Sequence, residues 1–391
     1  MNPSTSASRS PLLAGVTVLE LGTMVTAPLA GRMLDDLGAR VIKVENPAQG
    51  DPFRRHATGH DSPQFCAYNH GKESVALNLR ETAGRAALLR ILESADVLID
   101  NFRPGVLARL GLDDATLCAV NPRLVRCSIT GFGRDGPYAQ RPAYDSVALA
   151  LSGVAALTVD PANPFFSGPT IADNVTGMYA CYGVLGALYR RSQTGEGARI
   201  EINMLDASVA FIPDCIAIAG HLPGRITPHT RVAISQAYAV RCADEQLLAL
   251  HLSSSQDNWL KLLEVLDRQE WQQDPRFASP ASRASHFYVL NEMLGEAFRA
   301  RPLSHWLSVL EAADLPHAPI RNVAEIADNP QLQHLGTLED ITSASGTSYT
   351  AVRTPVLVDG VRPPIGSAPP TLGQHTEAVL AEFSAQAPGG E

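Results

Sequence analysis

Residues 16–45 read VTVLELGTMVTAPLAGRMLDDLGARVIKVE, and this stretch decides the fold class. Residues 16–21 are β-branched and apolar, as in a buried strand, and residues 39–45 repeat that pattern. Between them, residues 28–37 begin with proline and have the composition of a helix. A strand, a helix and a second strand in this order predict a right-handed βαβ crossover in a parallel sheet.

The same alternation continues along the chain. Further strands are expected at residues 72–79, 95–100, 123–130 and 198–203, and helices at residues 81–94, 143–153, 178–191 and 204–219. The fold class is therefore α/β, with a Rossmann-like large domain on an open parallel sheet. A second pattern of two strands and three helices in residues 232–313 predicts a smaller α+β domain.

Two changes of composition mark the domain boundaries. Residues 220–230 turn to Gly, Pro and His, and residues 328–330 read Asp-Asn-Pro. The expected division is a large domain of residues 1–220 and 328–391 and a small domain of residues 225–326. After the second boundary a Pro-rich tail is expected, with a last helix near residues 377–383 and disorder from 385 to 391.

Two features resemble parts of a dinucleotide-binding site. The turn after residue 21 lacks the second and third glycines of a dinucleotide fingerprint, so Glu45 is expected to be a solvated strand end. Residues 131–136 match G-x-G-x-x-G literally, but Pro137 and the polar residues after it do not continue as a close-packed helix. A glycine loop over a different ligand is therefore favoured over a nicotinamide or flavin site.

Composition excludes several classes of protein. Across 391 residues, 31 basic residues face 40 acidic ones without a basic block, so nucleic acid is not an expected partner. Six cysteines without a C-x-x-C pair indicate reduced, mostly buried thiols. The polar N-terminus is not a signal peptide and no apolar run spans a bilayer, which predicts a cytoplasmic protein without membrane contact.

Residues 46–71 are rich in Pro, Gly, Asp and His and predict a long surface loop. His56, His60 and Asp61 lie in it, but no further ligand follows at a metal-binding spacing. No metal site is therefore expected. After the strand at residues 95–100, by contrast, residues 101–111 carry Arg103 and Arg109 at the carboxyl end of a parallel strand, where an anion site is plausible.

Residues 167–177 read SGPTIADNVTG and carry one acid, Asp173, before a strongly apolar helix. An Asp at the start of a helix is most often an N-cap that accepts backbone N–H bonds. The helix after it, residues 178–191, is apolar nearly all round, so it is expected to be buried. A buried carboxylate at such a position is the alternative, and it would be a reactive group.

These motifs together resemble the class III CoA-transferases, the CaiB/BaiF family, which contains formyl-CoA transferase and is related to the α-methylacyl-CoA racemases. The resemblance runs nearly end to end, and it rests on Val18–Leu21, Leu37–Glu45, Gly50, Asp51, Asn101–Gly105, Arg109, Gly133–Tyr138, Tyr144, Asp145, Ala172–Gly177, Thr194–Gly197, Asp274–Phe277 and Leu372–His375. Each motif alone is a weak signal.

The resemblance implies that Asp173 attacks an acyl-CoA thioester and carries the acyl group as an anhydride and then CoA as a thioester. It implies a CoA-transferase that moves CoA from a donor such as succinyl-CoA to a carboxylic acid. Tyr144 and Asp145 match the pair beside the reacting carbonyl, with helix capping as their alternative role. The racemase branch has His at the position of Tyr144, and a tyrosine is a poor base at neutral pH.

By the same resemblance, CoA is bound as a substrate and no permanent cofactor is expected. The implied contacts are Val25, Lys72, Asn101, Phe102 and Arg109, with Arg109 at the nucleotide phosphates and Phe102 beside the adenine. A solvated helix face or loop is the alternative for Arg109 and Lys72.

The chain departs from the formyl-CoA transferase pattern at three places. Val25 replaces an active-site glutamine, Asn46 replaces an arginine that contacts the nucleotide, and residues 229–238 lack the triple glycine of a lid. The formyl and oxalyl substrate pair is therefore in doubt. The family further implies a homodimer of interlocked chains. The remaining alternatives are a racemase and a non-catalytic CoA-binding subunit, and the presence of Asp173 argues against the second.

Overall fold

The computed structural model describes residues 10–55, 61–221, 226–253 and 255–385. The chain divides into two compact units. The larger comprises Met1–Ala155, Gly168–Pro213 and Gln333–Glu391, and the smaller comprises Ala156–Ser167 and Asp214–Leu332. The larger unit is thus assembled from three separate segments of the chain.

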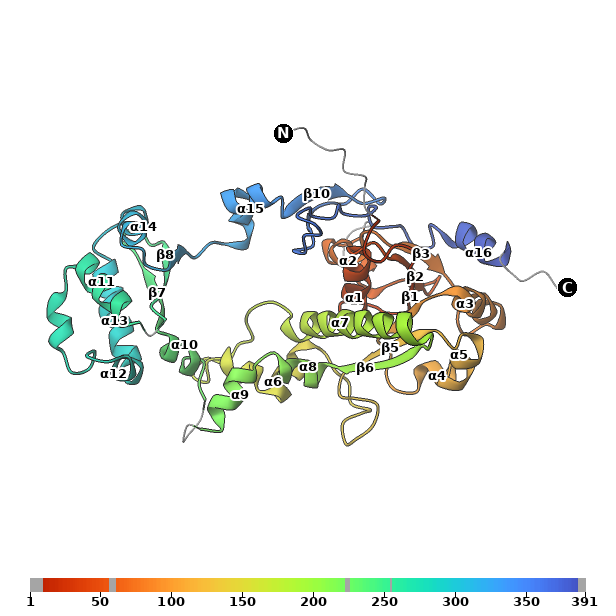
Figure 1. Cartoon of the computed structure of the whole chain (residues 1–391), viewed down its shortest axis with the longest axis horizontal. Coiled ribbons are helices and arrows are strands. Elements are labelled where there is room, and N and C mark those ends of the chain that lie inside the picture. Colours follow the sequence, from red (N-terminus) through yellow and green to blue (C-terminus); the bar gives the residue numbers. More distant parts are fainter. Residues whose placement is uncertain (1–9, 56–60, 222–225, 254, 386–391) are drawn as a thin grey trace. The chain divides into compact units, whose positions relative to one another are not determined.

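A six-stranded parallel sheet forms the centre of the larger unit, in the order β3-β2-β1-β4-β5-β6 (Figure 1). The strands are β1 Thr17–Glu20, β2 Arg40–Glu45, β3 Glu73–Ala76, β4 Val97–Asp100, β5 Val125–Thr130 and β6 Ala198–Asn203. This is the order of a dinucleotide-binding Rossmann sheet, and its direction of winding reverses between β1 and β4. The predicted α/β fold with an open parallel sheet is confirmed.

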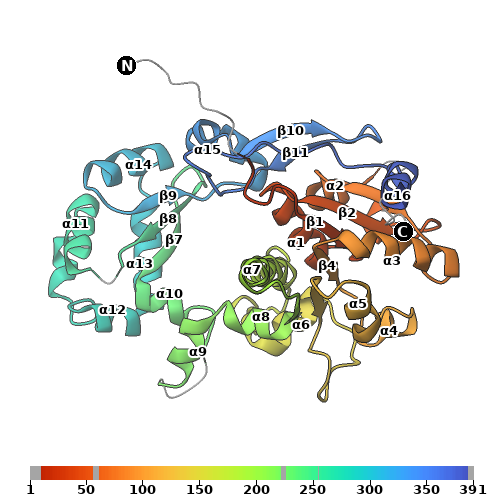
Figure 2. The ribbon, with the colours of Figure 1, turned by 45° about the vertical axis from the view of Figure 1, so that its right-hand side comes forward.

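Helices cover both faces of this sheet. Val18 of β1 packs into one core with α1 (Thr26–Asp35) and α7 (Ile171–Thr194). Figure 2 shows α7 in end view. The next residue, Leu19, packs into the opposite core with α3 (Thr82–Ser94) and α16 (Thr376–Ala385). Because successive side chains of a strand point to opposite faces, a strand covered on both sides buries apolar side chains on both, as Val18 and Leu19 of β1 do.

The remaining elements include some that the sequence pattern did not predict. They are α2 Pro63–Asn69, α4 Val106–Arg109, α5 Asp114–Val120, α6 Asp145–Ser152, α8 Met204–Ala210, α9 Pro213–Ala219, α15 Pro330–Leu335 and the hairpin β10 Leu338–Thr342 with β11 Ser348–Val352. The hairpin lies between the expected boundary at residues 328–330 and the prolines of the tail, where no element was predicted. The single helix expected over residues 204–219 is two helices, because Pro213 can begin a helix but not continue one.

The expected surface loop at residues 46–71 is largely wrong. Ser62 caps α2 by accepting a hydrogen bond from the backbone N–H of Phe65, and Phe65 is fully buried. Glu45 is not a solvated strand end, because it is buried and its carboxylate accepts bonds from Arg54. Arg54 also pairs with Asp61 at 3.0 Å. His56 and His60 lie outside the described residues.

The smaller unit has the predicted α+β character. Its antiparallel sheet consists of β7 Ala237–Arg241, β8 Leu247–His251 and β9 His317–Pro319. Its helices are α10 Thr230–Ser235, α11 Gln256–Leu266, α12 Pro280–Ser285, α13 Phe287–Phe298 and α14 Leu303–Ala312. One apolar core, with Trp259 and Phe277 fully buried in it, joins the sheet to these helices.

The cysteines agree with the sequence expectation. All six cysteines are free thiols, and four of them are buried. In the part of the chain that the structure describes, no helix has the length and apolarity needed to cross a membrane.

Candidate active site

Asp173 lies in the first turn of α7, as its third residue, and is not the N-cap. Thr170 occupies the N-cap position, and its side chain makes no capping bond. The backbone N–H of Asp173 donates instead to Oδ1 of Asp145, at 3.2 Å. The capping role that an isolated Asp would most often play therefore falls to Asp145, which begins α6, and the carboxylate of Asp173 is left available.

Burial, followed by the negative charge of Asp145, raises the pKa of Asp173 to about 6. A carboxylate in water prefers to be charged, so each loss of hydration and each neighbouring anion makes ionisation harder. A raised pKa means a more basic oxygen, and the group is still mostly ionised at neutral pH. Asp173 therefore has the properties of a carboxylate nucleophile.

Tyr144 precedes Asp145 in the chain but differs from it in position and exposure. It is the N-cap residue of α6, and 63% of it is exposed. The structure brings Asp145 into direct contact with the backbone of Asp173, whereas Tyr144 is exposed to solvent. Of the predicted pair, Asp145 is thus the residue that acts on Asp173.

Helices α1 and α7 cross closely one turn beyond Asp173. A Cβ atom placed on Gly177 would lie 2.7 Å from the carbonyl oxygen of Thr26 and 3.0 Å from Leu29. Only glycine allows this approach. The crossing sets the start of α7 against the start of α1, whose preceding residues, Gly22 and Thr23, line a cavity of the larger unit.

That cavity, of about 580 Å³, opens at the carboxyl ends of the central strands. It is lined by residues at or after the carboxyl ends of β1, β2, β3 and β4, namely Leu21–Thr23, Val44–Asn46, Gly50, Asp51, Leu77–Arg80, Phe102, Val106, Arg109 and Leu110. Open parallel sheets bind their ligands in this position, next to the point where the strand order reverses.

Two arginines give the cavity its positive charge. Arg109, from α4, was expected there, and Arg80, four residues after the end of β3, was not. Both side chains are exposed, and neither has a carboxylate partner among the described residues. The acids on the same wall are already neutralised, Glu45 by Arg54 and Asp51 by Lys43. Two unpaired guanidinium groups at this edge suit a phosphate-bearing ligand.

The position of Arg80 after an expected strand is a sequence signal for this site. Arg80 follows an expected strand, just as Arg109 follows one, and the carboxyl ends of parallel strands converge on the same edge. Applying that rule to every strand would have found it.

Asn101 and Phe102, also expected at this site, have different positions. Phe102 lines the cavity. Asn101 does not line the cavity but supports a residue that does, Thr23. The side-chain amide of Asn101 donates to the Thr23 carbonyl at 2.8 Å, and its side-chain oxygen accepts from the Thr23 N–H at 3.0 Å. Asn101 therefore fixes the shape of the turn between β1 and α1.

Lys72 and Val25 do not reach the cavity. Lys72 is fully buried, and its ammonium donates to Glu20, to the Pro28 carbonyl and to Asn69 at 2.7–3.0 Å. Three acceptors satisfy all three of its protons, so Lys72 has a structural role here and no proton remains for a phosphate. Val25 is buried at the N-cap of α1 and is not among the lining residues.

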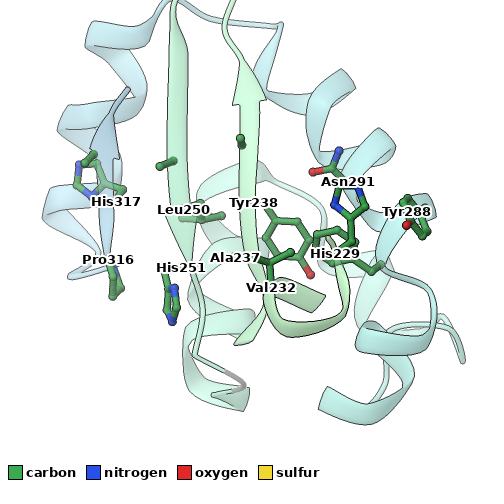
Figure 3. Close-up of a pocket in the computed structure, with 14 residues that line it drawn as sticks. His229, Val232, Ala237, Tyr238, Leu250, His251, Tyr288, Asn291, Pro316 and His317 are labelled. Atoms are coloured by element: carbon green, nitrogen blue, oxygen red, sulfur yellow. The ribbon is translucent and has the colours of Figure 1, made fainter. Parts of the chain in front are cut away.

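The smaller unit has a cavity of its own, of about 580 Å³, between its sheet and α13 (Figure 3). Tyr238 forms part of its wall, stacked on Phe287, and His229 packs edge-on against Tyr288. Residues 230–235, where a glycine lid was missing from the sequence, form the helix α10 instead. The lining is mostly apolar, so this cavity suits a hydrocarbon group better than a phosphate.

Comparison with known proteins identifies the family. A model of CoA-transferase family III matches residues 13–376. The chain belongs to this family. It is 35% identical over 346 residues to acetyl-CoA:oxalate CoA-transferase of Acetobacter aceti, covering 85% of this chain and 86% of that protein. It is 33% identical to succinate–glutarate CoA-transferase of Agrobacterium fabrum, covering 96% of both.

A solved structure agrees with this assignment. The crystal structure of a CaiB/BaiF family protein from Brucella suis matches this CoA-transferase with a TM-score of 0.84 and 30% identity, covering 96% of this chain and all of the other. The family predicted from the sequence motifs is thereby confirmed, and the protein is an enzyme.

Proposed function

We propose that this CoA-transferase moves CoA from an acyl-CoA to a carboxylic acid, with Asp173 as the covalent carrier. The observation that carries the proposal is the half-buried Asp173 carboxylate, held against Asp145 at the start of a long helix. Family membership supports the reaction type. A carboxylate nucleophile suits this exchange because it keeps the acyl group activated throughout.

In the proposed reaction, a carboxylate oxygen of Asp173 attacks the thioester carbon, the C–S bond breaks, and CoA leaves as a thiolate. The thiolate then attacks the Asp173 carbonyl of the resulting anhydride, which releases the donor acid and leaves an aspartyl-CoA thioester. The acceptor carboxylate attacks that thioester to form a second anhydride with release of thiolate. The thiolate finally attacks the acceptor carbonyl, giving the new acyl-CoA and free Asp173.

The start of α7 supplies the electrostatics for these steps. The first N–H groups of a helix have no partner within the helix and favour negative charge nearby. Developing negative charge on a carbonyl oxygen at this end is therefore stabilised without reorganisation. The partial burial of Asp173 limits access of water, which would hydrolyse both the anhydride and the thioester.

The cavity with Arg80 and Arg109 is the proposed site for the nucleotide of CoA. The two guanidinium groups would hold its phosphates and Phe102 would lie beside its adenine. The thiol arm would then pass along Gly22 and Thr23 toward the α1–α7 crossing and Asp173.

For substrates, we propose succinyl-CoA as a donor and a dicarboxylic acid as acceptor. The two relatives described above are named for oxalate and for succinate and glutarate. The test is to supply succinyl-CoA with a panel of mono- and dicarboxylic acids in deuterium oxide and to follow acyl-CoA products by mass spectrometry. New acyl-CoA without deuterium at the α-carbon supports transfer. Deuterium uptake without transfer would instead identify a racemase and overturn the proposal.

The fall in activity at low pH should report the protonation of Asp173. Because only the ionised carboxylate attacks, kcat/KM for acyl-CoA should fall about tenfold per pH unit below a midpoint near the pKa of about 6. Asp145→Asn removes the negative charge that helps to raise this pKa, so the midpoint should move to lower pH. A pH–rate profile of both proteins measures the shift. An unmoved midpoint in the variant would assign the acid limb to another group.

We also propose that two copies of the chain form a homodimer across α7. The helix is apolar nearly all round, as the sequence indicated, but the expected full burial is wrong for the single chain. Met178, Tyr182 and Tyr189 are 53%, 74% and 73% exposed, and their spacing places them on one face of the helix. An apolar stripe of this kind marks a surface that a partner covers.

Tyr182→Asp should therefore weaken the dimer. Placing a charge at the centre of the stripe should cost about 2 kcal/mol or more, the effect of a typical hot-spot residue, and raise the dimer Kd at least roughly 30-fold. Light scattering coupled to size exclusion, over a dilution series, measures this. Tyr182→Phe keeps the apolar area and should remain dimeric, whereas an unchanged mass for the Asp variant would place the interface elsewhere.

A further inference from the structure

A cluster of three potential metal ligands lies in the larger unit, outside the residues that line the CoA cavity. Asp35 is the last residue of α1, Asp36 follows it, and His70 follows the end of α2. One ligand atom from each lies within 4.8 Å of the others. The three residues come from two separate helix ends, so the tertiary fold and not the sequence spacing brings them together.

The hydrogen bonding of this cluster is incomplete. His70 is fully buried, and within the described part of the chain neither of its ring nitrogens has a hydrogen-bond partner. Oδ2 of Asp35 is likewise buried and unpartnered there. Buried polar groups are nearly always paired, and an unpaired one costs about 1–3 kcal/mol. Several such atoms converging on one point indicate that a further species satisfies them.

Two glycines let the backbone approach the Asp35 carboxylate closely on one side. A Cβ atom on Gly71 would lie 1.8 Å from Oδ2 of Asp35, and one on Gly366 would lie 3.0 Å from the same atom. Gly71 also has a positive φ of 78°, and its N–H donates to the Ser367 carbonyl at 2.7 Å. The carboxylate is therefore held in a glycine cradle beside the imidazole.

We propose that Asp35, Asp36 and His70 bind a divalent first-row metal ion, with Zn²⁺ the best match to one imidazole and two carboxylates. Tetrahedral Zn²⁺ with bonds of about 2.0–2.1 Å needs its ligands about 3.4 Å apart. Because the ligand atoms lie within 4.8 Å of one another, the cluster would close by at most about 1.4 Å on binding. Two carboxylates balance the charge of the ion. A water molecule would complete the coordination.

The surrounding charges are compatible with this site. Burial, followed by the nearby Arg32 and Lys72, lowers the pKa of His70 to about 3, so the imidazole is neutral as a metal ligand must be. Burial and the charge of Asp36 raise the pKa of Asp35 to about 7, so Asp35 would release a proton on binding. Lys72 is neutralised by Glu20, and Arg32 contacts Asp36 through one loose bond of 3.4 Å.

The experiment is a calorimetric titration of the tag-free protein with Zn²⁺ after removal of metals by EDTA and dialysis. One ion per chain is expected. Zn²⁺ at a hundred times its Kd should multiply the ratio of folded to unfolded protein about 100-fold, visible as a higher Tm. Co²⁺ in the same site should give the visible absorption of a four-coordinate ion.

His70→Gln should abolish the stoichiometric binding and the Co²⁺ spectrum, and Asp35→Asn should do the same if the first variant folds poorly. His305→Gln is the matched control, since His305 is exposed on α14 in the smaller unit, and it should bind as the wild type does. Wild-type protein that binds no ion, or a folded His70→Gln variant that still binds one per chain, would overturn the site. Neither result affects the proposed CoA transfer, which uses Asp173.

Discussion

Asp173→Asn should reduce kcat for CoA transfer by roughly 10⁴-fold or more, the size of effect seen when a covalent nucleophile is removed. The amide cannot form the anhydride, and neither Asp145 nor Tyr144 can replace it, because Asp145 is committed to the Asp173 N–H. The measurement is the initial rate of acyl-CoA formation from succinyl-CoA and the best acceptor acid. A variant with more than a tenth of the wild-type rate would remove Asp173 from the mechanism.

Two controls separate chemistry from folding. Asp206 occupies the same third position of a helix, in α8, and is exposed, so Asp206→Asn should keep full activity. Folding stability of Asp173→Asn should equal or exceed that of the wild type. The folded-state pKa of Asp173 is raised, so its ionised form disfavours folding above that pKa, and this penalty disappears with the charge.

Trapping the covalent intermediates tests the role of Asp173 directly. Wild-type protein incubated with acyl-CoA and then with hydroxylamine or borohydride should carry a modification on the peptide that contains Asp173. The adduct should be absent from Asp173→Asn and present in Asp206→Asn. An unmodified wild-type protein that still turns over would contradict a covalent path.

Arg109→Ala should raise the KM for acyl-CoA about 10- to 100-fold. A charge-assisted hydrogen bond to phosphate contributes about 1.5–3 kcal/mol. Arg109 has no carboxylate partner among the described residues, so the variant loses the bond to phosphate and no ion pair within the protein. Arg80→Ala should have an effect of the same size, because Arg80 lines the same cavity. Steady-state kinetics with varied acyl-CoA gives both values.

The control substrate is the acyl-pantetheine thioester, which lacks the nucleotide. Its KM should be the same for wild type, Arg80→Ala and Arg109→Ala, because neither arginine then has a phosphate to bind. Arg90 is exposed on α3 and outside the cavity, so Arg90→Ala should leave both substrates unaffected. An unchanged KM for acyl-CoA in Arg109→Ala would move the phosphates to another site.

The sequence was informative where one local pattern has one structural solution. Apolar β-branched runs alternating with helices can be buried only as a parallel sheet covered on both faces, which is what β1 to β6 form. The residues after those strands were candidates for the same reason, and Phe102 and Arg109 do line the cavity at that edge. Asp173 stood out because it is the only acid at the start of the most apolar helix.

The sequence was misleading where polar residues are paired over long distances. Lys72 and Glu45 look like surface groups because each is charged and lies near a turn, yet Lys72 pairs with Glu20 and Glu45 with Arg54 in the interior. Whether a charge is solvated or buried depends on partners that the local pattern does not contain. The helix α2 was missed for a similar reason, since it packs against α1 and against β11, and both are distant from it in the sequence.

By itself, then, the sequence determined the parallel α/β sheet and the family and singled out Asp173 as the candidate nucleophile, because these follow from periodicity and from motifs that are contiguous in the chain. Only the tertiary structure decided that Asp145 caps the helix of Asp173, that Arg80 joins Arg109, that Lys72 is structural and that Asp35 meets His70. Each of these depends on two segments far apart in sequence, and their distance is set by how helices and strands pack.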